Sequence, residues 1–223
     1  KIMASYYTTR YTPDPGRTKV WRAIINYLEK YIGKSCNAVI DIGCGYGDFI
    51  NNVNAKKKYA IDLNAEAAGF LSESVDFHST RVTDLSRIED ASIDVAFSSN
   101  LLEHLSDEEL AIAASEFRRI LRPGGLFITM QPNFYYAYRE YFDDFTHKKV
   151  FSHESLVDFF RANNFELVAI EKRFLPFSLK SRLPKTYLLT RMYLASFYRP
   201  SAKQMLGVFQ KGVAIQNHAK EIS

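Results

Sequence analysis

The chain has 223 residues and a net charge of +4, with 47% hydrophobic and 24% charged residues, which excludes a disordered chain and predicts one domain over residues 1–223. No run of about 18 apolar residues occurs and the first residues lack an apolar signal segment, which argues against a spanning helix and against secretion. Cys36 and Cys44 are predicted to be free thiols in a reducing compartment, which favours a cytoplasmic protein.

Helix and strand signals alternate along the chain, which predicts an α/β fold with a parallel sheet covered by helices on both faces. After a breaker cluster at residues 13–16, apolar positions at helical spacing predict a helix over residues 18–32. Short apolar stretches predict four strands, over residues 38–41, 58–62, 75–78 and 93–98. Helices are expected after the first two strands, over residues 48–53 and 65–71.

The second half of the chain continues this alternation. Ser106 followed by three acidic residues is typical of a capped helix start, and Pro123-Gly124-Gly125 is expected to end that helix. A second capped helix is predicted over residues 152–163. Further strands are predicted over residues 126–130, 165–174 and 204–213. A basic, aromatic insert over about residues 176–203 precedes the last strand and has helical spacing in its second half.

A glycine turn follows the first predicted strand. Asp41 precedes three glycines, Gly43, Gly45 and Gly47, and a helical segment is expected next. Backbone N–H groups in such a turn, together with the positive end of a helix, bind a ligand that approaches the main chain closely. A carboxylate ahead of the turn would repel a pyrophosphate but would orient an α-ammonium group. The pattern therefore favours a cofactor with an amino-acid moiety over a dinucleotide.

Two further acids stand at the ends of the next strands. Asp62 ends the second strand, where a carboxylate can accept hydrogen bonds from both ribose hydroxyls. Asp84 follows the third strand and is placed to accept from an adenine amine, with Leu63 and Leu85 flanking the ring. The carboxyl ends of the strands of an open α/β sheet line one ligand crevice. The three acids and the glycine turn therefore predict S-adenosylmethionine (SAM) as the cofactor.

These features resemble the class I SAM-dependent methyltransferases, in particular members that modify small molecules and glycans. The resemblance covers roughly residues 36–175, and its motifs are VIDIGCGYG at 39–47, AIDL at 60–63, TDL at 83–85, FSSNLLEHL at 97–105 and ILRPGG at 120–125. It implies a Rossmann-like sheet of seven strands, six parallel and the last antiparallel. It also implies that Asp41 and the glycine turn hold the methionine moiety, Asp62 the ribose and Asp84 the adenine, with Asn100 near the sulfonium.

His147 is the candidate general base. It lies in the segment DDFTHKKVF at 143–151, which resembles an Asp-x-Thr-His segment near the methyl-transfer crevice of O-methyltransferase-like members. An imidazole titrates near neutral pH and can take a hydroxyl proton, with a role in fixing the surrounding loop as an equal alternative. Glu103 and His104 have the residue types of a metal site or a base. The resemblance implies a structural role for this pair, and no metal is predicted.

The acceptor side is expected between residues 131 and 203. Tyr135, Tyr136 and Arg139 are predicted to shape the acceptor site, with core packing as the alternative for the tyrosines. Residues 172–223 carry 10 Lys and Arg against 1 Asp or Glu, whereas the rest of the chain carries 19 against 24. Cations interleaved with Leu, Tyr and Phe suit a phosphorylated or nucleotide-linked sugar or an anionic membrane. We therefore expect a small acceptor, anionic or lipid-linked, with a sugar or glycan hydroxyl, and peripheral association with the inner membrane face through residues 172–203.

Other functions remain open from the sequence. Methylation of a quinone or phenolic metabolite would use the same core and the same histidine. A non-catalytic SAM-binding accessory protein would keep the cofactor residues, although His147 argues for catalysis. Nucleic acid is not an expected partner, because the nearest stretch to a base-methylating Asn-Pro-Pro-Tyr motif, MQPNF at 130–134, does not match it.

Overall fold

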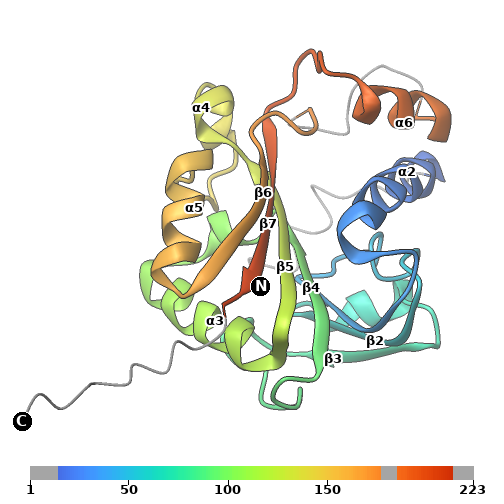
Figure 1. The fold of residues 1–223 in the computed structure, drawn as a ribbon, viewed down its shortest axis with the longest axis vertical. Helices are drawn as coiled ribbons and strands as arrows, with labels where there is room; N and C mark the ends of the chain where they lie inside the picture. Colours follow the sequence, from blue (N-terminus) through green and yellow to red (C-terminus); the bar gives the residue numbers. More distant parts are fainter. Residues whose placement is uncertain (1–14, 177–184, 213–223) are drawn as a thin grey trace, which may run out of the picture.

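The computed structural model describes residues 15–176 and 185–212, which form a seven-stranded sheet with helices on both faces (Figure 1). The strands are β1 (Cys36–Ile42), β2 (Ala55–Asp62), β3 (Val75–Ser79), β4 (Ile93–Ser99), β5 (Leu121–Pro132), β6 (Phe165–Glu171) and β7 (Gln204–Lys211), in the spatial order β3-β2-β1-β4-β5-β7-β6. Strands β1 to β5 pair in parallel, and β7 runs antiparallel to both β5 and β6. The predicted sheet, six strands parallel and the last antiparallel, is confirmed.

Helices cover both faces and enclose two apolar cores (Figure 1). They are α2 (Pro15–Ile32), α3 (Asp107–Ile120), α4 (Phe134–Ala137), α5 (His153–Ala162) and α6 (Tyr187–Ala195), with 3-10 turns η1 (Ala65–Phe70), η2 (Leu102–His104) and η3 (Tyr141–Asp143). On the face of α3 and α5, Phe117 and Phe160 pack around Phe127 of β5. On the face of α2, Trp21 packs edge-on against Phe97 of β4. The sheet is thus buried on both sides, as its continuous apolar strands require.

The two capped helices begin where the sequence places them. Ser106 accepts a hydrogen bond from the N–H of Glu109 at 3.2 Å, and the Glu109 carboxylate accepts from the N–H of Ser106 at 2.9 Å. Ser152 and Ser155 form the corresponding pair at the start of α5. Each reciprocal pair satisfies two N–H groups that have no partner within the helix. Both predicted starts are confirmed.

Two predicted helices are wrong. Residues 48–53 form turns: the N–H groups of Asn51 and Val53 bond carbonyls four residues back, but that of Asn52 bonds the carbonyl of Phe49, three residues back, and the segment then enters β2 at Ala55. The side chain of Asn51 bonds the carbonyl of Phe70 at 2.8 Å, which ties these turns to η1. The helix expected over residues 65–71 is the 3-10 turn η1. Asn64 caps it, and its N–H groups bond carbonyls three residues back, a pattern typical of short connections.

Strand β5 is longer than predicted at both ends. It starts at Leu121, directly after α3, with an irregularity in which Ile93 pairs with Leu121 and Val95 with Leu126. Pro123 lacks an N–H for the ladder, and Gly124 has φ +73°, so these residues bulge rather than end the pairing. At the other end, pairing with β7 carries β5 to Pro132. Residues 131 and 132 of β5 pair with the antiparallel strand β7, which is distant in sequence, so the sequence near β5 does not predict this extension.

The described part of the predicted insert contains the helix α6, which packs against α2 (Figure 1). Residues 177–184 of the insert, and residue 213 of the predicted last strand, lie outside the described residues. Strand β6 ends at Glu171, three residues earlier than predicted, and Glu171 binds Lys30 of α2 and Arg199 after α6. Within the described ranges, no helix is long and apolar enough to cross a membrane. The single-domain organisation stays a prediction.

Candidate functional site

The glycine turn leaves β1 at the carboxyl edge of the sheet. The N–H of Gly43 donates to the carbonyl of Ile61 at 2.9 Å, which ties the turn to β2. Gly45 and Gly47 have φ values of +51° and +68°, where a side chain is strained. A Cβ at Gly47 would overlap Leu71, whereas a Cβ at Gly45 would meet no atom within 4 Å. Packing therefore requires Gly47, and Gly45 leaves the main chain open to a ligand.

Asp41 and Asp62 are buried on either side of this turn. Burial raises the pKa of Asp41 to about 8; a backbone hydrogen bond from Ile50 opposes the shift, and the nearby Asp62 adds to it. The Asp62 carboxylate accepts from the N–H of Gly45 at 2.8 Å and from the N–H of Asn64 at 2.8 Å. Each carboxylate oxygen keeps a second lone pair. Asp62 therefore fixes the turn and retains the capacity to accept ribose hydroxyls.

Asp84, Leu63 and Leu85 have different surroundings. Asp84 is exposed on the loop after β3, where hydrogen bonds from Ser86 lower the pKa of its carboxyl. Leu63 is 51% exposed beside Asp62, so it offers an apolar surface to a ligand. Leu85 is buried in the core on the α3 face. The side chain of Leu85 thus packs in the core in this structure, and its contact with adenine stays a prediction.

Asn100 ends β4 in a left-handed conformation, with φ +51°. Asn tolerates this region better than most residues, and strained residues concentrate at functional sites. Its N–H donates to the carbonyl of Met130, and its side-chain oxygen accepts from Gln204 at 3.0 Å. The sequence analysis did not single out Gln204. No local pattern marks it, because the pairing of β7 with β5 brings it to the edge.

The loop that carries His147 is tied to the short helix η2. The N–H groups of Lys148 and Lys149 donate to the carbonyl of Glu103 at 2.8 and 3.0 Å. The ring of His147 lies 4.9 Å from that of His104 and 4.6 Å from that of Tyr141, between centroids. His147 is therefore held beside η2, which follows β4, and its role as general base stays a prediction.

A hydrogen-bond chain orients His104. The hydroxyl of Thr146 donates to Asp144 at 2.6 Å, so it can only accept from Nδ1 of His104, which lies at 3.0 Å. Burial lowers the pKa of His104 to about 4, with the neighbouring His147 adding to the shift. His104 is therefore neutral, with its proton on Nδ1 and a lone pair on Nε2. Asp144 and Thr146 were not predicted as orienting groups, although both stand in the segment DDFTHKKVF next to His147.

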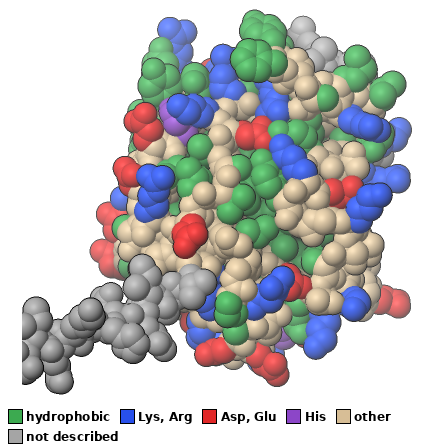
Figure 2. Space-filling model, in the orientation of Figure 1, with side chains coloured by type: hydrophobic (Ala, Val, Ile, Leu, Met, Phe, Trp, Pro, Cys, Tyr) green, Lys and Arg blue, Asp and Glu red, His purple; other side chains and the backbone are tan. Residues whose placement is uncertain are grey.

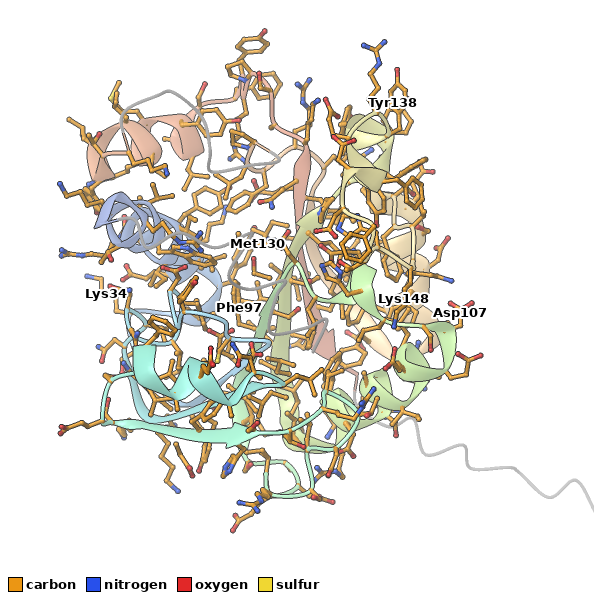
Figure 3. The ribbon with its side chains drawn as sticks, turned by 180° about the vertical axis from the view of Figure 1, so that it is seen from behind. Lys34, Phe97, Asp107, Met130, Tyr138 and Lys148 are labelled. Atoms are coloured by element: carbon orange, nitrogen blue, oxygen red, sulfur yellow. The ribbon has the colours of Figure 1, made fainter. Side chains whose placement is uncertain are left out.

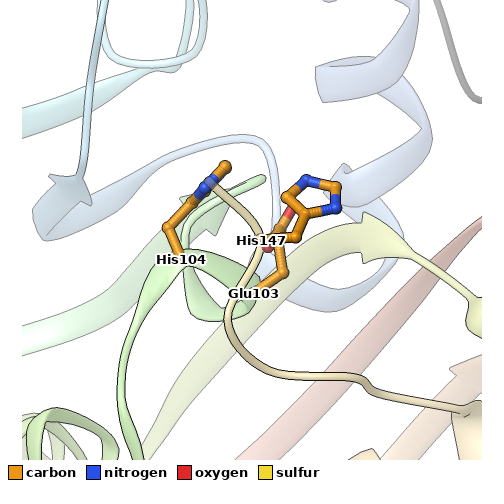
Figure 4. A group of neighbouring side chains, drawn as sticks. All are labelled: Glu103, His104 and His147. Atoms are coloured by element: carbon orange, nitrogen blue, oxygen red, sulfur yellow. The ribbon is translucent and has the colours of Figure 1, made fainter. Parts of the chain in front are cut away.

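Glu103 is fully buried next to the two histidines (Figure 4). Its carboxylate oxygens have no hydrogen-bond partner among the described residues, and burial raises its pKa to about 8. Glu103, His104 and His147 each offer one ligand atom, and these atoms lie within 4.8 Å of one another. By residue type the group could hold a divalent cation, whereas the sequence predicts no metal. Protonation of Glu103 would remove its buried charge without a metal.

The predicted acceptor residues lie on and around α4. Tyr135 and Arg139 are exposed, and Tyr136 is half-buried between Arg173, whose guanidinium carbon is 5.1 Å from its ring centroid, and the ring of His153. Core packing, the alternative role predicted for the tyrosines, therefore fits Tyr136. Tyr135 is exposed and is available to an acceptor. His153 and Arg173 were not predicted as neighbours of α4. They lie far from α4 in the sequence, and the folding of the chain around the sheet brings them next to it.

A cavity of about 480 Å³ lies at the opposite, amino edge of the sheet. It is lined by the starts of β1, β4 and β5, including Cys36, Asp94 and Arg122. Asp94 is fully engaged there, since it binds Arg122 and accepts from the N–H groups of Asn37 and Ala38. This cavity is therefore separate from the edge that gathers the predicted site residues.

Comparison with known proteins agrees with this geometry. Residues 40–129 match the family model described as a methyltransferase domain. The chain shares 30% identity over 112 residues with phosphoethanolamine N-methyltransferase 1 of Triticum aestivum, covering 46% of this chain and 22% of that protein. It shares 26% identity over 121 residues with the ubiquinone biosynthesis O-methyltransferase of Aromatoleum aromaticum, covering 49% and 51%. The matches thus span about half or less of these curated relatives.

Solved structures share the whole architecture. A SAM-dependent methyltransferase from Archaeoglobus fulgidus superposes with a TM-score of 0.63 at 20% identity, over 86% of this chain and 94% of that chain. A geranyl diphosphate C-methyltransferase from Streptomyces coelicolor, in complex with Mg²⁺, geranyl diphosphate and S-adenosylhomocysteine, superposes with a TM-score of 0.60 at 15% identity, over 85% and 80%. Residues 40–129 thus match a methyltransferase domain, and the described residues have the fold of SAM-dependent methyltransferases.

The methyltransferase domain fits its cofactor in the region where the sequence expected it. The approach to Gly45 is open, and the buried carboxylate of Asp62 reaches the same turn. Asn100 stands at the end of the adjacent β4. The glycine turn, Asp62 and Asn100 therefore form one edge from three neighbouring strands, the edge where open α/β sheets bind ligands.

Proposed function

We propose that this methyltransferase domain transfers a methyl group from SAM to a hydroxyl of a small acceptor, a sugar or a lipid-linked glycan. The observation that carries the proposal is the position of His147 at the carboxyl end of β4, tied through its loop to Glu103, next to the cofactor edge. A nucleotide-type turn and a group able to take a proton thus share one edge of the sheet.

Methyl transfer requires the protein to position the acceptor and to accept one proton from it. SAM, when bound, supplies a methyl group that is attached to a sulfonium. Transfer of this methyl group leaves a neutral thioether. Holding the acceptor hydroxyl in line with that methyl removes most of the entropic cost of the reaction. His147 takes the hydroxyl proton in our proposal, and His104, Thr146 and Asp144 hold its surroundings in one arrangement.

The residues of α4 support an anionic acceptor. Arg139 is exposed, and its Nε lies 3.1 Å from the hydroxyl of Tyr138, which keeps the guanidinium at the surface of the edge. Tyr135 is exposed beside it, and Tyr136 carries Arg173 over its ring. Two cations next to two phenol rings suit a phosphorylated or nucleotide-linked sugar, where the cations pair with phosphate and a ring packs on the sugar.

A phenolic or quinone acceptor is the second candidate. The exposed aromatic residues Tyr135, Tyr138, Phe142 and Phe145 favour it, because planar rings bind one another edge-on or offset. The relative from Aromatoleum aromaticum is named as an O-methyltransferase of ubiquinone biosynthesis. This candidate uses the same cofactor edge and the same histidine.

Calorimetric titration with SAM and S-adenosylhomocysteine tests the cofactor assignment. We expect both to bind, and binding of neither would contradict the proposal. Transfer of labelled methyl to nucleotide sugars, lipid-linked glycans and catechols then separates the two acceptor classes. The protein would be a non-catalytic SAM-binding protein if it binds SAM but transfers no methyl group to any acceptor, and if the His147→Ala variant behaves identically.

A further inference from the structure

Exposed apolar side chains gather on two segments at the carboxyl edge of the sheet, which we call the crest. The crest comprises residues 134–145, with α4 and η3, and residues 187–198, with α6 (Figure 1). Ten of its large apolar side chains are exposed, with Phe197 fully exposed and Phe145 76% exposed; the others are Tyr135, Tyr138, Phe142, Tyr187, Leu188, Leu189, Met192 and Tyr198. Figure 3 shows Tyr138 pointing away from the sheet, in contrast to Phe97 and Met130 inside it. Single exposed apolar residues are ordinary, but this concentration marks a binding surface.

Contacts beside the two segments bring them to the same edge of the sheet. The N–H of Asn133, which precedes the first segment, donates to the carbonyl of Lys203, which follows the second, at 2.8 Å, and the ammonium of Lys203 pairs with Glu140 of the first segment. These contacts follow from the pairing of Pro132 with Gln204 in the sheet. The segments therefore lie at one edge, although residues 146–186 separate them in the chain.

The crest borders the proposed active site. Gln204, the first residue of β7, which is the next element after the second segment, bonds the side chain of Asn100 at 3.0 Å. The first segment continues into the loop of His147, whose N–H bonds the carbonyl of Asp144 at 3.2 Å. A partner that binds the crest is thus held next to the cofactor edge.

The charge of the stretch that contains the second segment indicates the kind of partner. Residues 172–203 contain eight Lys and Arg and no Asp or Glu, whereas the first segment carries Arg139 against Glu140, Asp143 and Asp144. Two of these cations, Arg199 and Lys203, pair with acids of the protein, whereas Lys172, Arg173 and Arg191 are exposed. Figure 2 shows hydrophobic side chains next to Lys and Arg along the edge that carries α4 and α6. Aromatic and aliphatic side chains flanked by cations are typical of surfaces that insert into the headgroup region of an anionic bilayer.

We propose that the crest seats on an anionic membrane surface, so that the acceptor is an amphiphile that enters the site from the bilayer. The inference rests on the proposed function and adds the orientation of the domain: the carboxyl edge of the sheet faces the lipid, and the amino edge faces away from it. The aromatic rings of α4 and of residues 197 and 198 enter the interface, and Arg191 pairs with lipid phosphates.

Sedimentation with vesicles tests the proposal. The probes are vesicles of phosphatidylcholine alone and of phosphatidylcholine mixed with phosphatidylglycerol, each at low and high salt. We expect the protein to bind the mixed vesicles at low salt and to dissociate at high salt. The double variants Phe142→Ser/Phe145→Ser and Phe197→Ser/Tyr198→Ser should each weaken binding by about tenfold, because each removes two rings from the interface.

Matched controls keep the expected losses specific. Ile112→Ser removes an apolar side chain that is 50% exposed on α3, away from the crest, and should leave vesicle binding unchanged. Arg191→Glu should weaken binding by about fivefold or more, whereas Lys56→Glu, on the exposed part of β2, should have little effect. Thermal unfolding of every variant identifies any that fails to fold. If one double variant fails to fold, vesicle binding by the other double variant tests the proposal.

Three outcomes overturn the proposal. They are no binding of the mixed vesicles at low salt, binding that neither double variant weakens, and concentration-dependent self-association that both double variants abolish. The last outcome would identify the crest as an interface between two copies of this chain. S-adenosylhomocysteine binding is measured on the same samples, so failure of the membrane inference with normal cofactor binding is distinguishable from failure of the proposed function.

Discussion

The predicted cofactor side and the proposed acceptor side of this domain meet at one edge but are built in opposite ways. On the cofactor side, Asp41 and Asp62 are less than 5% exposed, and backbone N–H groups fix their surroundings. On the acceptor side, Tyr135, Phe142 and Phe145 are more than half exposed. A cofactor bound by the main chain needs a rigid turn, whereas an acceptor site that varies between enzymes can be carried by exposed side chains on loops.

The largest effect is expected where the two sides join. His147→Ala should lower kcat by about 10²- to 10⁴-fold, because it removes the proposed base, while the Kd for S-adenosylhomocysteine stays unchanged. Steady-state kinetics and calorimetry measure the two quantities. His78→Ala, on the edge strand β3, is the matched histidine control. A near-normal kcat in His147→Ala would leave His147 with only a loop-fixing role.

On the cofactor side, Asp62→Ala should raise the Kd for S-adenosylhomocysteine by about 10- to 100-fold. The substitution removes the acceptor of the Gly45 and Asn64 N–H groups as well as the proposed ribose contact. Asp76→Ala on β3 is the control, since its side chain is 60% exposed. Vesicle binding should be the same in both variants. An unchanged Kd in Asp62→Ala would remove this residue from the cofactor site.

The glycine turn allows a finer separation of folding from binding. Gly47→Ala should lower the free energy of unfolding by about 2–4 kcal/mol, because its Cβ overlaps Leu71 and its φ is left-handed. Gly45→Ala has the backbone strain without the overlap, so it should cost about 1–2 kcal/mol. Gly45→Ala should nevertheless lose more cofactor affinity. Chemical denaturation measures the loss of stability in each variant, and calorimetry measures the loss of cofactor affinity. The prediction is contradicted if the same variant shows the larger loss in both measurements.

Stability of the cofactor-free protein should fall as the pH rises from about 6.5 to 8. Below this range the lowered pKa of His104 acts in the opposite direction, because the unfolded chain then holds a proton that the folded state lacks. The folded state holds the protons of Asp41 and Glu103 up to about pH 8, whereas the unfolded chain releases them near pH 4. The folded state then binds more protons than the unfolded state, so stability decreases through this window. At pH 8, Asp41→Asn should be more stable than the wild type by about 1–3 kcal/mol.

Glu116→Gln is the control for this pH dependence. Its hydrogen bond with Arg119 lowers the pKa of Glu116, so its carboxylate stabilises the fold above its pKa and the substitution should destabilise the protein at pH 8. Thermal unfolding at a series of pH values measures both effects. A wild-type protein whose stability rises steadily from about pH 6.5 to 8 would contradict the protonated state of Asp41 and Glu103.

The smallest effect is expected from metal removal. Dialysis against EDTA should leave kcat unchanged, because the proposed base is the imidazole of His147 and no metal is predicted. Added Zn²⁺ should inhibit, since Glu103, His104 and His147 offer ligand atoms within 4.8 Å and binding would occupy the lone pair of the base. Loss of activity in EDTA with recovery on adding a divalent cation would show that a metal, rather than His147 alone, activates the acceptor.

Sequence periodicity determined the order of the strands along the chain and the two capped helices. Apolar strands that end on Asp41 and Asp62 and the caps at Ser106 and Ser152 depend on contacts within a few residues, so local patterns identify them. The helices predicted after β1 and β2 are wrong, and the two segments are joined to each other. Asn51 bonds residues 70 and 72, about 20 positions away, and such a contact has no signature in a local window.

Only the tertiary structure decided how the acceptor side is assembled. The sheet pairs Pro132 with Gln204, and this brings Lys203 to Glu140 and Gln204 to Asn100 from distant parts of the chain. The three side chains Glu103, His104 and His147 likewise meet because the loop after α4 folds back on η2. The cofactor turn is continuous in sequence, since a single strand and turn supply its N–H groups. The acceptor side depends on the antiparallel strand β7, and its neighbours are set by sheet pairing rather than by spacing along the chain.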